Sequence, residues 1–154
     1  MPGYGIEPAI EGKGLLPWAF ARERLERTRN YMLATVTPEG GPHVMAVWGV
    51  WLDDMFYFST SPTSRKARNI AANPRVVITA DDPRNAVIAE ATVSALGDHA
   101  PARRVISAYN EKYNWETPED EAFLVARPHK VFAFVETSDT ESQFAQTATR
   151  WTFG

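Results

Sequence analysis

Three short runs of strand-forming residues follow one another in the first half of the chain. They are YMLATV (31–36), PHVMAVWGVWL (42–52) and MFYFS (55–59). Pro38-Glu39-Gly40-Gly41 and Asp53-Asp54 supply turn residues between them. Strands joined by such short turns are antiparallel, because a parallel pair needs a long crossover connection. The pattern therefore favours an antiparallel sheet over a doubly wound α/β fold.

The second of these runs is apolar on both faces. Alternation places Val44, Ala46 and Trp48 on one face, and His43, Met45, Val47 and Gly49 on the other. We therefore expect this strand to be covered on both sides, either by a closed or half-closed barrel or by a second subunit.

The remaining elements are predicted from periodicity and from Pro, Gly and Asn punctuation. Helices are expected over 17–29, 64–72, 100–113 and about 117–126, and further strands over 75–80, 86–96, 131–135 and 149–154. Residues 1–16 hold four glycines and two prolines, so we expect an N-terminal arm there and a single domain over 17–154. The predicted fold is mainly β, a six-stranded antiparallel barrel with peripheral helices.

Composition excludes several classes of function. A formal net charge of −3 argues against a general nucleic-acid binder. There are no cysteines, and the three histidines lie far apart in no metal-binding spacing, so we expect no metal site. No apolar run is long enough to span a bilayer and the first residues do not resemble a signal peptide, so we expect a cytoplasmic protein.

The segment STSPTSRK, Ser59 to Lys66, crowds hydroxyls and two cations into a turn that opens the predicted helix 64–72. One interpretation is an N-capped surface helix, with Ser61, Thr63 or Ser64 as the cap. The other is an anion site, because a helix start presents free N–H groups that suit a phosphate. These residues alone do not choose between the two.

The run from PHVMAVWGVWLDDMFYFST to SRKARNIAANPRVVITADD resembles the pyridoxamine 5′-phosphate oxidase-like superfamily. It looks most like the branch that binds the deazaflavin F420 or a flavin. The resemblance implies a split β-barrel of the FMN-binding type and a homodimer that holds the cofactor at its interface. It also implies that the cofactor phosphate lies at the strand end and helix start described above.

Carried over by motif, the resemblance implies a set of cofactor-binding residues. For the phosphate they are Ser59, Thr60, Ser64, Arg65 and Lys66. Flanking the ring are His43, Met45, Ala46, Val47 and Trp48. Near the C-terminus, Arg150 and Trp151 are candidates from the same or the other subunit. Apolar strand residues usually pack inside, so an ordinary core role is the leading interpretation for any one of Met45, Val47 and Trp48.

The chain departs from the enzymes that make pyridoxal phosphate. Those have an arginine where His43 stands, a glutamine near Ala86 and a C-terminal motif that is missing here. The resemblance therefore points to F420, with FMN as the alternative. We expect a reductase that passes hydride from reduced F420 to a small electron-poor molecule, with His43, Tyr109 or solvent supplying a proton. An FMN-dependent reductase or oxidase, a non-catalytic carrier of F420, FMN or haem, and a plain dimeric structural protein stay open.

Overall fold

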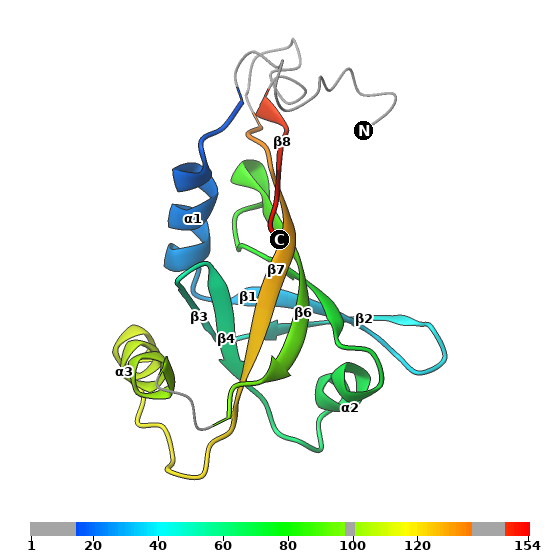
Figure 1. Ribbon diagram of the computed structural model, residues 1–154, viewed down its shortest axis with the longest axis vertical. Coiled ribbons are helices and arrows are strands. Elements are labelled where there is room, and N and C mark those ends of the chain that lie inside the picture. The colour runs from blue at the N-terminus through cyan, green and yellow to red at the C-terminus, as the bar shows by residue number, and fades with distance from the viewer. Residues whose placement is uncertain (1–14, 98–100, 137–146) are drawn as a thin grey trace.

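A curled antiparallel sheet organises the fold, and the α-helices of the described residues lie around it (Figure 1). The structure is a computed structural model that describes residues 15–97, 101–136 and 147–154. Most of the expected N-terminal arm, residues 1–14, lies outside this range, so the predicted boundary of the domain stays a prediction.

Helices and strands follow in an order close to the predicted one. The helices are α1 (Trp18–Arg27), α2 (Arg65–Ala72) and α3 (Pro101–Tyr113), with a 3-10 turn, η1 (Pro83–Asn85). The strands are β1 (Tyr31–Val36), β2 (Pro42–Val47), β3 (Val50–Leu52), β4 (Met55–Ser59), β5 (Arg75–Thr79), β6 (Val87–Ala95), β7 (Phe123–Ala133) and β8 (Thr149–Thr152). No helix in the described ranges has the length and apolar character that a membrane crossing needs. The cytoplasmic location stays a prediction.

The strand order is β2-β1-β5-β6-β7-β4-β3, with β8 paired to β7, and every pairing is antiparallel. The predicted mainly β split barrel is confirmed. Its sheet has eight strands within the described residues, where six were expected for the barrel. The number is higher because the run 42–52 is divided in two and because β8 joins the sheet.

The division of that run places consecutive strands, β2 and β3, at opposite ends of the sheet. Trp48 and Gly49 connect the end of β2 to the start of β3. A Cβ on Gly49 would lie 2.3 Å from the Phe56 ring and 2.8 Å from the Tyr57 carbonyl oxygen. Only glycine fits such a close approach, and the single strand that we expected over 42–52 is wrong for this reason.

The helix predicted over 117–126 is also wrong. The Thr117 N–H and hydroxyl both donate to the Asn110 side-chain oxygen, at 3.1 and 2.6 Å, so this threonine closes α3 and opens no new helix. Phe123 already pairs with Ser59 of β4. The strand predicted over 131–135 is the last part of the longer β7, which pairs with both β4 and β6.

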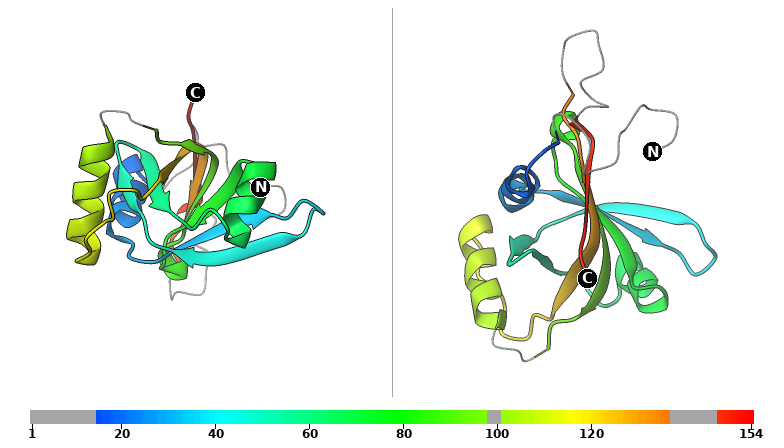
Figure 2. Two further views of the ribbon diagram at one scale, coloured as in Figure 1. Left: turned by 90° about the horizontal axis from the view of Figure 1, so that it is seen from below. Right: turned by 45° about the horizontal axis from the view of Figure 1, so that its top comes forward.

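Two clusters of buried side chains form the core. The larger lies between the sheet and α1, where Ala21 and Leu25 are fully buried. The smaller joins α3, through Val105 and Tyr109, to Phe123 of β7. Figure 2 shows α2 and α3 on opposite sides of the strands. The two ends of the barrel are therefore covered by different helices.

Strand β2 is not covered within one chain. Val44 is 53% exposed and Met45 is 48% exposed. Because β2 is an edge strand of an incompletely closed sheet, the barrel does not cover both of its faces, as one of our two explanations required. The other explanation, a second subunit, is taken up below.

Candidate cofactor-binding site

The turn between β4 and α2 holds its own hydroxyl groups in place. Ser64 is the N-cap of α2, and its Oγ accepts a hydrogen bond from the Ala67 N–H at 3.2 Å. The Thr60 hydroxyl lies 3.1 Å from the Ser64 hydroxyl, and the Ser64 N–H donates to the Ser61 carbonyl at 3.0 Å. Ser64 is thus a true cap, as one of our two interpretations proposed.

The two cations that follow leave room for the other interpretation as well. Arg65 and Lys66 form the first turn of α2, and neither makes an ion pair with any residue that the structure describes. A helix start with two unpaired cations beside it is a suitable environment for a phosphate. Capping and anion binding are therefore compatible here. We call residues 60–66 the cradle.

Ser59 differs from its neighbours. Its hydroxyl donates to the Glu121 carboxylate across the start of β7. Glu121 falls within the helix predicted over about 117–126, but it lies against the end of β4 instead. The Ser59 hydroxyl therefore already has a hydrogen-bond partner, and Ser59 lies between the cradle and the Glu121 carboxylate.

A polar chain connects α2 to β2. The buried Asn69 amide of α2 donates to the Thr35 hydroxyl at 2.9 Å, and that hydroxyl lies 3.5 Å from His43 Nδ1. Because Thr35 and His43 are paired across β1 and β2, they share the face of the sheet that α2 covers. The structure thus brings His43 to the side of the barrel on which the cradle lies.

The other predicted residues of β2 differ in their surroundings. Val47 is 6% exposed and belongs to the core, and Met45 points to the same side as His43 but stays exposed at the edge. Ala46 lies on the opposite face. Trp48 stacks on Tyr113 of α3, with ring centroids 4.5 Å apart and planes 9° apart. Trp48 therefore belongs to the α3 side of the molecule.

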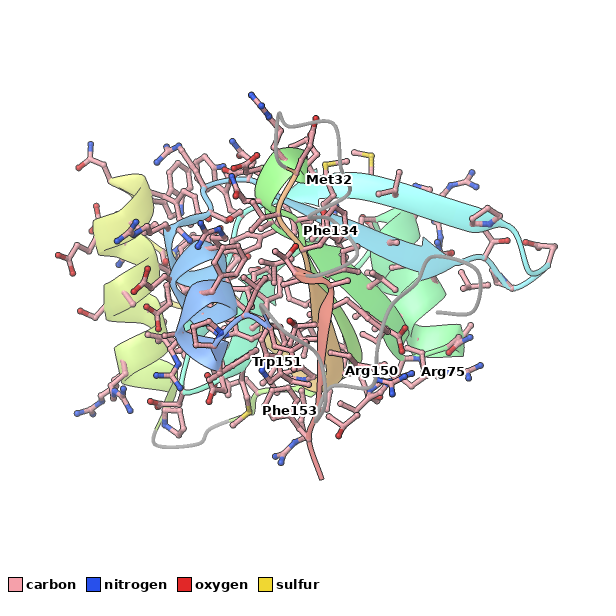
Figure 3. The ribbon with its side chains drawn as sticks, turned by 90° about the horizontal axis from the view of Figure 1, so that it is seen from above. Met32, Arg75, Phe134, Arg150, Trp151 and Phe153 are labelled. Atoms are coloured by element: carbon pink, nitrogen blue, oxygen red, sulfur yellow. The ribbon has the colours of Figure 1, made fainter. Side chains whose placement is uncertain are left out.

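Within one chain, Arg150 and Trp151 lie far from the cradle. Thr152 of β8 pairs with Lys130, whereas Ser59 pairs with Phe123, seven residues earlier in β7. At the usual rise of a strand this separates the two places by about 23 Å. Trp151 packs against Trp18 with ring centroids 5.3 Å apart, and Figure 3 shows Arg150 on the opposite side of β8.

The break at Gly49 is held by the end of α3. The Gly49 N–H donates to the Tyr113 hydroxyl at 2.8 Å, and the Gly49 carbonyl accepts from Lys112 Nζ at 3.0 Å. Lys112 also donates to the Tyr31 hydroxyl at 2.9 Å. Burial lowers the pKa of Lys112 to about 8, and burial raises that of Tyr31. We name these contacts of Lys112 and Tyr113 the α3 knot.

Sequence reasoning missed the residues around Trp48. Trp115, Thr117, Pro118 and Glu121 line one cavity with Trp48, Ser59 and Tyr109. Three of them, Thr117, Pro118 and Glu121, lie in the segment 117–126 that we expected to be helical, and Glu121 is 62 residues from Ser59 in the sequence. No local pattern signals such a contact.

The sequence matches a family model described as pyridoxamine 5′-phosphate oxidase over residues 18–134. The chain belongs to the pyridoxamine 5′-phosphate oxidase-like family. The matched region contains β1 to β7 and the cradle, so the predicted resemblance is confirmed. A search of curated proteins gave no match.

Several solved structures have a similar fold. One, an F420 reductase, is 29% identical, with 71% of this chain and 94% of that chain covered and a TM-score of 0.59. HutZ, a haem storage protein from Vibrio cholerae, is 23% identical, with coverages of 75% and 90% and a TM-score of 0.59. An FAD-binding protein from Mesorhizobium loti is 20% identical, with coverages of 75% and 92% and a TM-score of 0.63. Structures described as an F420 reductase, a haem storage protein and an FAD-binding protein thus share this fold.

Proposed function

We propose that this protein is a reductase that uses reduced F420 to transfer a hydride to a small electron-poor molecule. The observation that carries the proposal is the unpaired cation pair of the cradle, in a chain 29% identical to an F420 reductase. The alternative ligand with the same phosphate chemistry is FMN.

The residues present fit a cofactor that combines a phosphate with a flat ring. Ser64, Arg65 and Lys66 would hold the phosphate, since the helix start and both cations favour a negative charge. The exposed Met45 would lie against the ring. Bound reduced deazaflavin supplies the hydride, so the protein has to provide only position and electrostatics. His43, oriented by Thr35, would hold a proton beside β2.

The proposal includes a homodimer. The outer face of β1 and β2 carries Met32, Val44 and Ala46, all exposed, and apolar patches on a sheet edge are typical of interaction surfaces. A partner subunit would also bring a second Arg150 and Trp151, which one chain keeps away from its own cradle. Sedimentation should give a dimer for the wild type and a monomer for Val44→Glu. Glu39→Lys, in the exposed turn after β1, should stay dimeric, and a monomeric wild type would contradict this part.

The cofactor is tested by titrating F420 and FMN side by side into the purified protein. We expect a preference for F420. We expect Arg65→Ala/Lys66→Ala to weaken the affinity for F420 by at least about 100-fold, because each of the two charge-assisted hydrogen bonds contributes about 1.5–3 kcal/mol. The control, Arg27→Ala/Arg103→Ala, removes the same total charge from α1 and α3 and should leave the affinity for F420 unchanged. Unchanged affinity in the cradle variant would refute the phosphate site, and a preference for FMN would move the proposal to that cofactor.

Catalysis is tested separately from binding. Reduced F420 bound to the protein is mixed with electron-poor enones or quinones, and cofactor absorbance is followed. Oxidation above the protein-free rate supports the reductase. Tight binding without oxidation would make the protein a carrier.

A further inference from the structure

A small cavity lies between α3, the segment after it and the end of β4. Its volume is about 170 Å³, below the ~300 Å³ at which pockets for drug-sized ligands begin, so it suits a small chemical group. Three aromatic residues line it, Trp48, Tyr109 and Trp115, together with Ser59 and Glu121. The cradle is on the other side of Ser59, so this cavity is a separate place.

The aromatic rings are tilted toward one another. The Trp48 ring makes an angle of 74° with Trp115 at a centroid distance of 6.2 Å, and an angle of 60° with Tyr109 at 6.4 Å. A flat aromatic ligand is best held between parallel rings. Walls that are inclined by these angles suit a rounded group that meets several rings at once.

Each wall is held in place by contacts outside the cavity. Trp48 stacks on Tyr113, and Tyr109 meets Phe123 edge-on with centroids 5.2 Å apart. Trp115 follows a left-handed residue, Asn114 with φ 49°, and its N–H donates to a carbonyl of α3 at 3.1 Å. Trp115 is nevertheless 52% exposed. Trp115 therefore has a fixed backbone and a ring that is open to a ligand, and its ring meets that of Trp48 across the cavity.

The only charged residue lining the cavity is acidic. The Glu121 carboxylate is oriented by the Ser59 hydroxyl, and no lysine or arginine of the described chain lines the cavity. Burial raises the pKa of Tyr109 to about 12, and the neighbouring Tyr113 and Glu121 add to this, so the field of the carboxylate reaches the ring. A positive charge lies behind the Trp48 wall: the Arg29 guanidinium is 5.9 Å from the centroid of the Trp48 ring and 5.2 Å from that of Tyr113.

We propose that this cavity binds a small organic cation of the tertiary or quaternary ammonium class. The electron-rich faces of tryptophan and tyrosine attract such cations, and a carboxylate adds charge complementarity. Glu121 and the aromatic walls act together, because the ammonium group needs little hydrogen bonding and fills a rounded site. The inference goes beyond the proposed cofactor chemistry and does not rest on it.

The test compares choline with 3,3-dimethylbutan-1-ol, in which carbon replaces the charged nitrogen. Binding to the full-length protein is measured by calorimetry and by ligand-observed NMR. We expect choline to bind at least tenfold more tightly than the neutral alcohol. Equal affinities would mean that the cavity is merely apolar, and no binding of choline would also overturn the proposal.

Two variants assign the binding to this cavity. Glu121→Gln keeps an oxygen for the Ser59 hydroxyl but removes the charge, and Trp115→Leu removes an exposed wall that the core does not need. Each should weaken choline binding about five- to tenfold. Glu119→Gln in the same turn should have no effect. Arg65→Ala/Lys66→Ala should leave choline binding intact, so failure of the cofactor proposal and failure of this one are distinguishable. Choline affinity unchanged by both cavity variants would refute the site.

Discussion

The cradle and the α3 knot both hold polar groups at the end of a strand, but they do so differently. In the cradle, Ser64 bonds to groups three or four residues away, and Arg65 faces solvent. In the knot, Tyr113 bonds to Gly49 and to the Arg29 carbonyl at 2.7 Å, 64 and 84 residues away. The cradle is built from contacts between near neighbours in the sequence and faces solvent. The knot is built from contacts between residues far apart in the sequence and is largely buried.

This difference separates the two regions by their physical roles. Open cations with no partner in the described chain contribute little to the stability of the fold and are available to a ligand. Buried donors and acceptors that satisfy one another hold elements together, and the loss of one leaves another unpaired. We therefore expect substitutions in the knot to act on folding and substitutions in the cradle to act on binding.

Gly49→Ala should have the largest effect on folding. The added methyl group would lie 2.3 Å from the buried Phe56 ring and 2.8 Å from backbone, so the chain has to shift. We expect the free energy of unfolding to fall by about 3 kcal/mol, at the upper end for overpacking in a core. Urea unfolding followed by circular dichroism measures it.

The matched control is Gly154→Ala, since nothing lies within 4 Å of the Cβ that it would add. It should unfold like the wild type. If Gly49→Ala also unfolded like the wild type, the close approach that divides β2 from β3 would not be a constraint on this chain.

Tyr113→Phe removes the hydroxyl at the centre of the knot. The Gly49 N–H is then buried without its partner, which costs about 1–3 kcal/mol. Tyr57→Phe is the control, because among the residues that the structure describes its hydroxyl donates only a weak hydrogen bond, to the Met55 sulfur at 4.0 Å. The melting temperature should be lower than that of the wild type for Tyr113→Phe and unchanged for Tyr57→Phe. Equal melting temperatures in both variants would show that the knot adds no stability.

Ser64→Ala tests how much the N-cap in the cradle contributes to stability. Loss of an N-cap costs about 1 kcal/mol, here through the bond from the Ala67 N–H. Amide hydrogen exchange should quicken in the first turn of α2 and stay unchanged in α3. Thr63→Ala is the control, since within the described ranges the Thr63 hydroxyl hydrogen-bonds only to Ser61 of the same turn. Faster exchange in α3 would mean that the two regions are coupled.

The same difference decides what sequence could predict. The fold class, β1, β4 and the cap at Ser64 depend on neighbours along the chain, and their residues carry the signal. The break at Gly49 depends on Phe56 across a hairpin, so an apolar run looked continuous. The cavity depends on Asn110 closing α3 against Thr117, where a proline and acidic residues imitate a helix start. Long-range contacts overrode local pattern at both places.

The smallest expected effect is a pH dependence that comes from Lys112. Burial lowers its pKa to about 8, while Asp81 opposes the shift and Arg29 adds to it. Between pH 8 and about 10.5 an unfolded chain keeps the proton that the folded chain has lost, so the free energy of unfolding rises with pH. Below pH 8 both states carry the proton and this contribution is constant. Because Lys112 is partly exposed, solvent screening limits the rise to about 0.5 kcal/mol.

The window for the measurement is pH 7.5 to 9.5. The pKa values of Tyr31 and Tyr109 are raised by burial, so the folded chain holds those protons longer, and stability falls above about pH 10. The chain has no cysteine to titrate in between. Lys112→Met should therefore show a flat profile by urea unfolding where the wild type rises. If the free energy of unfolding of the wild type were as independent of pH as that of Lys112→Met, Lys112 would behave as a solvated cation, like Arg65. Tyr113 alone would then hold the knot.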